Sequence, residues 1–307
     1  MSLRASYVGT GGRKMPFPFN INQPAPGPGA YIDKPRPFPN LPGITEQRNG
    51  ASHSYNALNL EVERRFFQGF MFQSSFTLAK DLGDEDVTPE NTFDRRRERG
   101  QTQVQPYRRW IGFFIYELPF GRGKRFGSNM RGLAGALLGG WEISASGSLQ
   151  DGQNETPLWQ APDIHGVAFT TSRTAPSVPY RPDCISNPNL SNQTIGAWFD
   201  VTAFRLPTDP NTFGSCGRGI IRGPAVRVMH GGMFKSFKAG ERFKFRLGTQ
   251  VTNILNHPNW TNLSSNALRL DNTSARAKIT AADGATSGSA GDAPGSRAMR
   301  LDLRIDF

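Results

Sequence analysis

The chain closes with MRLDLRIDF, residues 299–307, in which charged and apolar side chains alternate up to an aromatic residue. The apolar set comprises Leu301, Leu303, Ile305 and Phe307. Arginine and aspartate occupy the positions between them. Because successive side chains of an extended strand point to opposite sides, this stretch predicts a β-strand with one apolar face and one charged face.

The same period of two recurs along the chain and predicts an all-β, antiparallel protein. The predicted strands are Leu3–Gly9, Tyr55–Arg65, Phe70–Asp81, Tyr107–Leu118, Trp141–Gln150, Val226–Phe237, Glu241–Leu255 and Met299–Phe307. Several of these approach the length of about 9 to 11 residues that a tilted strand needs to cross a bilayer. We therefore expect about eight strands of a transmembrane β-barrel.

The connections between these strands alternate between long and short. The long ones are residues 10–54, 82–106, 151–225 and 256–296, and the shorter ones are 66–69, 119–140 and 238–240. In an up-and-down antiparallel sheet, successive connections lie at opposite ends, so all long ones share one end. This asymmetry is typical of outer-membrane barrels, which have long extracellular loops and short periplasmic turns.

A soluble β-sandwich or lipocalin-like barrel is the alternative fold, because it also alternates apolar and polar positions. Long irregular connections of this kind are uncommon inside compact soluble domains, which favours the membrane barrel. Aromatic residues near the predicted strand ends would suit interfacial girdles. They are Tyr55, Trp110, Tyr116, Trp141 and Phe307.

Composition narrows the classes of function. The 307 residues have a mean hydropathy of −0.49, and no apolar run is long enough for a membrane-spanning helix. The opening MSLRASYVGT does not have the pattern of a secretory signal. The net charge is +11, but basic residues are spread along the chain and accompany no nucleic-acid-binding motif. We expect no nucleic-acid partner; a soluble basic β protein that binds nucleic acid is the minor alternative.

No motif of an enzyme or a metal centre is apparent. GTGGRK at residues 9–14 does not have the spacing of a phosphate-binding loop. His53, His165, His230 and His257 are scattered without ligand spacing. We expect neither catalytic residues nor a bound cofactor or metal, and the sequence does not identify ligand-binding residues.

Two charged runs fall in the predicted loop 82–106 and its border. The acidic run Asp81–Asn91 is expected to be a solvated loop, with a calcium site as the alternative. The basic run Arg95–Arg99 could pair with it, contact lipopolysaccharide or attract an acidic ligand, and pairing within the loop is favoured. Residues 119–140 predict a basic periplasmic turn with a short helix.

Cys184 and Cys216 are the only cysteines, and both lie in the loop 151–225. No CxxC pattern accompanies them, which argues against metal binding. We expect a disulfide that closes part of this loop, as oxidising compartments allow.

Several segments go beyond generic barrel chemistry. They are SYNALNLEVERRFFQGFMFQSSFTLAKDLGD at 54–84, FDRRRERG at 93–100, YELPFGRGKRF at 116–126, LLGGWEISASGSLQDGQ at 137–153, WFDVTAFRLP at 198–207, FGSCGRGIIRGP at 213–224 and FKSFKAGERFKFRLGTQVTNILNHPNW at 234–260. In order, they resemble the C-terminal barrel of Oar-like TonB-dependent receptors, a carboxypeptidase-regulatory-like domain family of the Gram-negative outer membrane. LRASYVGTGGRKMPFPFNINQPAPGPG at 3–29 resembles a strand and extracellular loop of the same family.

The resemblance implies that residues 1–307 are the C-terminal part of a larger barrel, without a plug or N-terminal domains. It implies a receptor or transporter whose loops bind a ligand and whose lumen passes it; the alternative is a structural or adhesive barrel subunit of a surface assembly. The implied partners are outer-membrane lipid and lipopolysaccharide, and the TonB complex through a plug elsewhere. A second chain that completes the barrel would be a further partner.

The terminal strand also has an implied role. Leu301, Leu303, Ile305 and Phe307 resemble the signal by which the barrel assembly machinery recognises outer-membrane proteins. Because the connection before this strand is one of the long, extracellular ones, the strand runs toward the periplasm and places Phe307 at the periplasmic rim.

Overall fold

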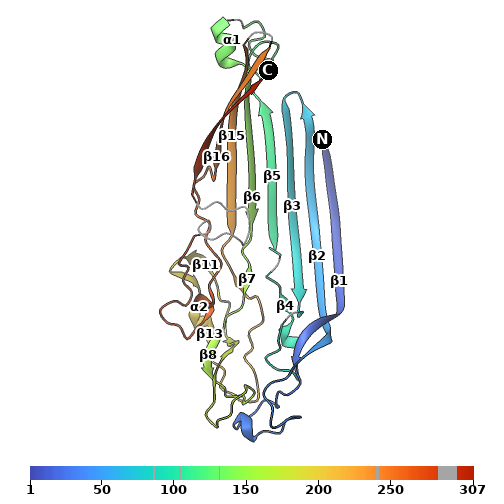
Figure 1. The fold of residues 1–307 in the computed structure, drawn as a ribbon, viewed down its shortest axis with the longest axis vertical. Coiled ribbons are helices and arrows are strands. Elements are labelled where there is room, and N and C mark those ends of the chain that lie inside the picture. Colours follow the sequence, from blue (N-terminus) through green and yellow to red (C-terminus); the bar gives the residue numbers. More distant parts are fainter. Residues whose placement is uncertain (86, 104, 131, 240–241, 283–295) are drawn as a thin grey trace.

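The computed structural model describes residues 1–307 except 86, 104, 131, 240–241 and 283–295, and strands dominate it (Figure 1). The strands are β1 Ser2–Asn20, β2 Thr45–Phe67, β3 Phe70–Gly83, β4 Gly100–Gln101, β5 Arg108–Glu117, β6 Trp141–Gln150, β7 Asn154–Glu155, β8 Trp159–Pro162, β9 Ser177–Tyr180, β10 Asp183–Cys184, β11 Asn189–Thr194, β12 Ala197–Phe199, β13 Phe204–Arg205, β14 Ile221–Arg222, β15 Val226–Ala239, β16 Phe243–Thr252 and β17 Ala298–Asp306. The helical elements are η1 Tyr31–Asp33, η2 Arg96–Glu98, α1 Gly132–Leu138, η3 Val201–Ala203 and α2 Ser265–Leu268.

The long strands form one antiparallel sheet in the order β1-β2-β3-β5-β6-β15-β16-β17, and β4 adds a short pairing to β3. This arrangement confirms the predicted all-β, antiparallel fold, and eight long strands form this sheet among the described residues. Within the described residues, β1 and β17 are each paired on one side only. The sheet is therefore open between its two edge strands.

The register separates an apolar face from a polar face, because directly paired residues point to the same side. One continuous row pairs Leu60 with Phe76, Phe76 with Trp110, and Trp110 with Leu149. Leu303 pairs with Leu247 and lies on the same side at the other edge. We call this side the apolar face.

The opposite side is the polar face, and its charged groups pair across strands. Arg246 on β16 lies 2.7 Å from Glu142 on β6. Gln250 donates to Asp302 on β17 at 2.7 Å, and Gln73 on β3 donates to Glu61 on β2 at 2.8 Å. Arg4 on β1 lies 3.6 Å from Glu61. The alternation seen in the sequence is therefore an alternation between two faces of one sheet.

The first long connection is shorter than predicted. Residues 10–54 were expected to be a loop, but β1 continues to Asn20 and β2 starts at Thr45, so the connection is 21–44. The two strands stay paired through a β-bulge at Met15. Glycines at positions 9, 11 and 12 hide the alternation, and backbone pairing does not need their side chains.

The other long connections differ little from their predicted bounds. β3 ends at Gly83 and β5 begins at Arg108, while residues 151–225 separate β6 from β15. Residues 253–297 separate β16 from β17, and of these 283–295 lie outside the described part. The long connections leave one end of the sheet, and residues 68–69 and 118–140 lie at the other (Figure 1).

The predicted aromatic girdle is only partly correct. Tyr116 and Trp141 lie at the short-turn end of β5 and β6, and Phe70 packs edge to face on Tyr116 with ring centroids 5.7 Å apart. Tyr55 is instead inside β2, paired with Asp81, because β2 extends far beyond its predicted start. In the described part of the chain, no helix is long and apolar enough to cross a membrane.

Candidate functional site

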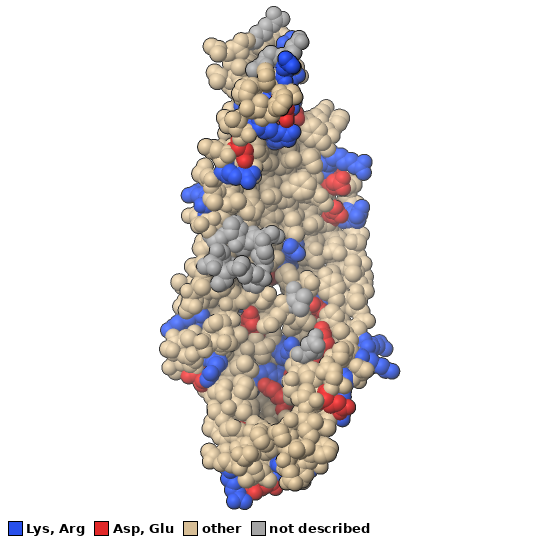
Figure 2. Space-filling model, in the orientation of Figure 1, with Lys and Arg blue, Asp and Glu red and all other residues tan. Residues whose placement is uncertain are grey.

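The described residues of 21–44, 84–107, 151–225 and 253–282 gather at the long-loop end of the sheet, and we call them the loop cap (Figure 1). Figure 2 shows Lys and Arg interspersed with Asp and Glu over this part of the molecule. Since loops carried on a rigid scaffold are common binding elements, the loop cap is the candidate functional site.

The loop cap has an apolar core of its own. Its buried members are Trp198, Phe199, Ala203, Phe204, Cys216, Ile221, Leu263, Ala267, Leu268, Leu270, Ala277 and Ile279. They come from the connections 151–225 and 253–282. Backbone hydrogen bonds join the same two connections, from Trp198 to the Ala277 carbonyl at 2.7 Å and from Leu270 to the Leu158 carbonyl at 2.8 Å. The two loops therefore fold as one unit rather than as independent excursions.

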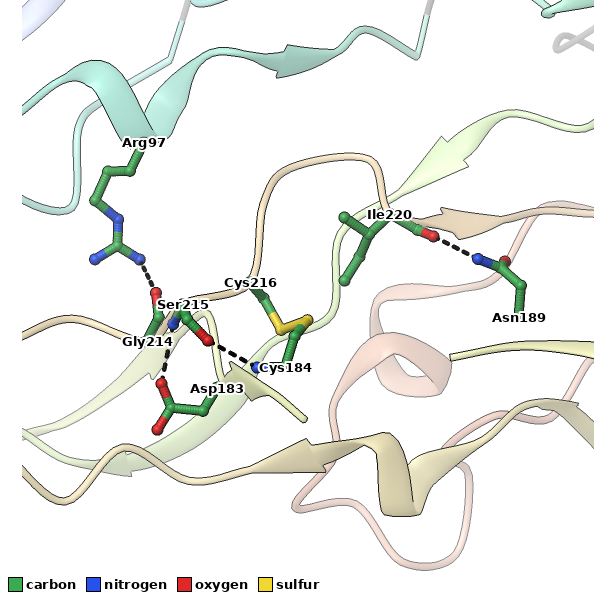
Figure 3. Close-up of a disulfide and its surroundings, with 8 residues drawn as sticks. All are labelled: Arg97, Asp183, Cys184, Asn189, Gly214, Ser215, Cys216 and Ile220. Atoms are coloured by element: carbon green, nitrogen blue, oxygen red, sulfur yellow. Dashed lines mark hydrogen bonds between the residues drawn. A yellow bond between two sulfur atoms is a disulfide. The ribbon is translucent and has the colours of Figure 1, made fainter. Parts of the chain in front are cut away.

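A disulfide joins Cys184 on β10 to Cys216, at a sequence separation of 32 (Figure 3). The backbone amide of Cys184 donates to the Ser215 hydroxyl at 3.0 Å, and the Ser215 amide donates to Asp183 at 3.0 Å. Next to it, Arg97 from the connection 84–107 donates to the Gly214 carbonyl at 2.6 Å. The disulfide thus lies where two separate connections meet.

The basic run Arg95–Arg99 pairs within its own connection, as the favoured interpretation predicted. Arg95 lies 2.7 Å from Asp84, Arg96 lies 2.9 Å from Asp94, and Arg97 lies 3.0 Å from Glu90. The Arg95 and Arg97 side chains are only 20% and 18% exposed, so these two pairs are more buried than pairs in the expected solvated loop would be. Burial favours retention of both pairs, because an unpaired buried charge is costly.

Arg181 connects this pair network to the longest loop. Its side chain is 2% exposed and donates to Glu90 at 3.1 Å and to Glu98 at 2.8 Å. Burial raises the pKa of Glu98, and the charge of Arg181 opposes that effect. Arg218 adds a bond to the Glu98 carbonyl at 2.9 Å. Two connections are therefore held together by buried charges that are satisfied only when both are in place.

Glu155 is a buried carboxylate that has no arginine partner among the described residues. It lies on β7, which pairs with β14, and is 4% exposed. Gln103 from the connection 84–107 donates to its Oε2 at 2.7 Å. Burial raises the pKa of Glu155 to about 7, and the Gln103 hydrogen bond offsets only part of this effect. This carboxyl therefore titrates near neutral pH.

His165 links the connection 21–44 to the connection 151–225. Its ring is fully buried, stacks on Phe213 at 4.1 Å and meets Tyr180 edge to face at 5.0 Å. The ring nitrogen Nδ1 lies 2.9 Å from the Pro210 carbonyl oxygen. Lys34 donates to the His165 carbonyl at 2.5 Å. All four long connections therefore contribute to one interlocked structure.

A family model for the outer membrane beta barrel domain matches residues 1–300 of the chain. The chain belongs to the outer membrane beta barrel domain family. No match was found among curated proteins or among solved structures.

As an outer membrane beta barrel protein, the chain resides in the outer membrane of a Gram-negative bacterium, which confirms the predicted localisation. The apolar face of the sheet meets lipid, the polar face lines the lumen, and the loop cap is extracellular. Leu301 and Leu303 lie on the apolar face at 77% and 64% exposure, with Ile305 in the same set. Such exposure of leucine is expected where the surrounding solvent is lipid.

The site residues predicted from the sequence lie in two separate parts of the structure. Leu301, Leu303, Ile305 and Phe307 lie at the C-terminal edge of the sheet, whereas Cys184 and Cys216 lie in the loop cap. In the described part of the chain, no three His, Cys, Asp or Glu side chains converge as metal ligands. Two carboxylates of the acidic run, which was the alternative calcium site, contact other side chains instead. Asp81 contacts His53, and Asp84 contacts Arg95.

Arg181, Glu155 and Lys34 belong to the loop cap but were not predicted from the sequence. Each lies in a loop without a local charge pattern, and each has its main partner far away in the sequence. Arg181 and Glu90 are 91 residues apart, and Lys34 and His165 are 131 apart. No signal in a single sequence indicates such pairs, because only the folded loops bring them together.

Proposed function

We propose that this chain forms part of the barrel of a TonB-dependent receptor, that its loop cap binds a ligand outside the cell, and that the ligand passes through the lumen. The resemblance of the segments between residues 54 and 260 to Oar-like receptors supports the transport mechanism. The plug that would contact the TonB complex belongs to a part of the receptor outside residues 1–307.

The observation that carries the proposal is the open sheet beneath an interlocked cap. β1 and β17 each have one paired side among the described residues, and in lipid an unpaired strand edge leaves backbone groups unsatisfied. Further strands that continue the sheet would satisfy these edges and widen the lumen. A large barrel has the interior volume that a plug and a solute need.

The neighbour of β1 can be identified by photo-crosslinking in the native outer membrane. Tyr7 on β1 is 69% exposed on the apolar face, so a photoreactive phenylalanine analogue replaces it conservatively. Leu58 is its paired residue on β2 and provides the matched control, because both of its neighbours lie in the described sheet. Mass spectrometry then identifies the peptides crosslinked at each position.

We expect position 7 to crosslink to a strand outside residues 1–307 and the purified complex to contain plug peptides. A crosslink from position 7 to residues 298–306 would mean that the eight strands close on themselves, which contradicts TonB-dependent transport. A crosslink to a second copy without a plug would favour the structural or adhesive subunit instead. Position 58 should crosslink within β1–β3 in every case.

A further inference from the structure

The connection 118–140 between β5 and β6 differs from an ordinary periplasmic turn. It lies at the short-turn end of the sheet and contains α1, Gly132–Leu138, which confirms the predicted short helix (Figure 1). The helix sequence GLAGALL has no charged residue, and none of its residues is buried. Leu133 is 81% exposed and Leu137 is 68% exposed.

More apolar surface accompanies the helix. Phe120 and Phe126 lie 5.6 Å apart between ring centroids and are 43% and 49% exposed. Large contiguous apolar surface on a folded protein marks contact with a partner or a membrane. The connection 118–140 therefore needs an apolar neighbour.

Two side chains attach α1 to the lipid side of the barrel rim. Trp141 Nε1 donates to the Leu137 carbonyl at 2.8 Å, and Lys235 Nζ donates to the same carbonyl at 3.1 Å. Trp141 and Lys235 are paired on β6 and β15 and belong to the apolar face. The C-terminal end of α1 therefore continues the lipid-facing surface. Tryptophan and lysine are also the residues that anchor membrane proteins at the interface.

Glycines hold the rest of the connection against this end of the helix. A Cβ on Gly121, whose φ is +109°, would lie 2.6 Å from the Gly139 Cα, so only glycine permits this close approach. Gly140 follows the helix at φ +74°, and its carbonyl accepts from the Ser236 amide at 2.8 Å. The helix is therefore fixed to the rim rather than suspended from a loose loop.

The charge of this connection has one sign. Residues 118–140 contain Arg122, Lys124, Arg125 and Arg131 and no acidic residue. Lys124 pairs with Glu117 at 2.6 Å. Arg122 and Arg125 are exposed, and neither forms an ion pair with a described residue. The exposed positive charge adjoins the exposed apolar surface, which is the pattern of segments that lie in a lipid interface.

We propose that the described residues of 118–140 are an interfacial anchor in the inner leaflet of the outer membrane, with anionic phospholipid as its ligand. Leu133, Leu137 and Phe120 insert among acyl chains, while Arg122 and Arg125 contact lipid phosphates. Continuity with the lipid-facing surface and the uncompensated positive charge select phospholipid over a protein partner. The proposal requires the barrel fold and does not depend on TonB-dependent transport.

Spin labels can measure the depth of this segment in the full-length protein. Both cysteines are in the disulfide, so a single introduced cysteine can be labelled specifically. L133C places the label on α1, L303C provides a lipid-facing reference and T208C provides an aqueous reference in the loop cap. Each protein is reconstituted in vesicles of phosphatidylcholine with or without phosphatidylglycerol, and accessibility to oxygen and to a water-soluble nickel chelate is measured.

We expect the label at 133 to resemble the label at 303, with an oxygen-to-nickel accessibility ratio several-fold above that at 208. Phosphatidylglycerol should increase this ratio, and R122Q/R125Q should remove the increase. A ratio at 133 equal to that at 208 would overturn the proposal. A label at 133 that neither reagent reaches would mean that a second copy of the chain covers the segment in place of lipid, and it would overturn the proposal equally.

Discussion

Glu155 provides a quantitative test of the loop cap. Its pKa is raised from the ordinary 4.5 to about 7 by burial, and its partner is the neutral amide of Gln103. The folded cap therefore holds a proton on Glu155 between these two pH values, where the unfolded chain has lost it. The stability that this proton contributes is fully present below about pH 4.5 and is lost as the pH rises through about 7.

The size of this effect follows from the two pKa values. Each unit between them corresponds to about 1.4 kcal/mol, so the ionised carboxylate costs the folded cap about 3 kcal/mol above neutral pH. The substitution Glu155→Gln removes the charge and keeps an oxygen that can accept from Gln103. We expect E155Q to stabilise the cap by up to about 3 kcal/mol at pH 8 and to change little at pH 4.

Hydrogen exchange followed by mass spectrometry is the assay, with the protein in detergent or nanodiscs. The amide of Gly223, which donates to the Gln153 carbonyl at 2.7 Å, reports opening next to Glu155. Comparison of variant and parent at each pH cancels the intrinsic dependence of exchange on pH. Greater protection in E155Q should appear at pH 8 and disappear at pH 4.

Glu98 provides the matched control, because it is also buried but pairs with Arg181 at 2.8 Å. Glu98→Gln leaves a buried guanidinium with less compensation, so E98Q should destabilise the cap at pH 8. The reasoning about Glu155 would be refuted if E155Q weakened protection at pH 8, or changed it equally at both pH values.

Three further predictions concern the disulfide, the buried Arg181 and the C-terminal Phe307. Replacing Cys184 and Cys216 by serine should lower the free energy of cap unfolding by about 3 to 4 kcal/mol, because the disulfide spans 32 residues. Hydrogen exchange of the cap amides at increasing urea concentration measures this change, and an unchanged urea midpoint would contradict the prediction. Arg181→Met should destabilise the contact between the connections 84–107 and 151–225 by about 3 to 5 kcal/mol, since it leaves Glu98 buried without its cation, whereas Glu90 keeps its pair with Arg97. Protease resistance of these loops tests this, and unchanged resistance would contradict it. Phe307→Ala should reduce the amount of heat-modifiable, folded barrel in outer-membrane fractions several-fold, whereas normal assembly would remove Phe307 from the proposed recognition signal.

The sequence predicts the strands best where side chains of both kinds alternate. β6 begins at Trp141 and ends at Gln150, as the period of two indicates, and β17, Ala298–Asp306, differs from the predicted Met299–Phe307 by one residue at each end. The outer half of the β1–β2 hairpin was missed because glycine and proline carry little alternation. Strand pairing there depends on the backbone, and one sequence does not show which backbone segments meet.

The candidate site is much harder to predict than the barrel. The sequence indicated that residues 95–99 pair locally and that Cys184 and Cys216 form a bridge. It gave no indication that Arg181 joins the same charge network or that Glu155 is buried. Local pairs follow from spacing, whereas contacts between loops depend on how four connections pack, which no period encodes.

The shared core of the loop cap limits how such a surface can diversify or be engineered. A loop that packed only on the barrel rim could be exchanged alone with the loop of another barrel. Here the connection 151–225 contributes Trp198 to a core completed by Ile279, and Arg181 to charges on the connection 84–107. A graft of one loop would leave half a core and half an ion network behind, so these loops are exchangeable only as a set.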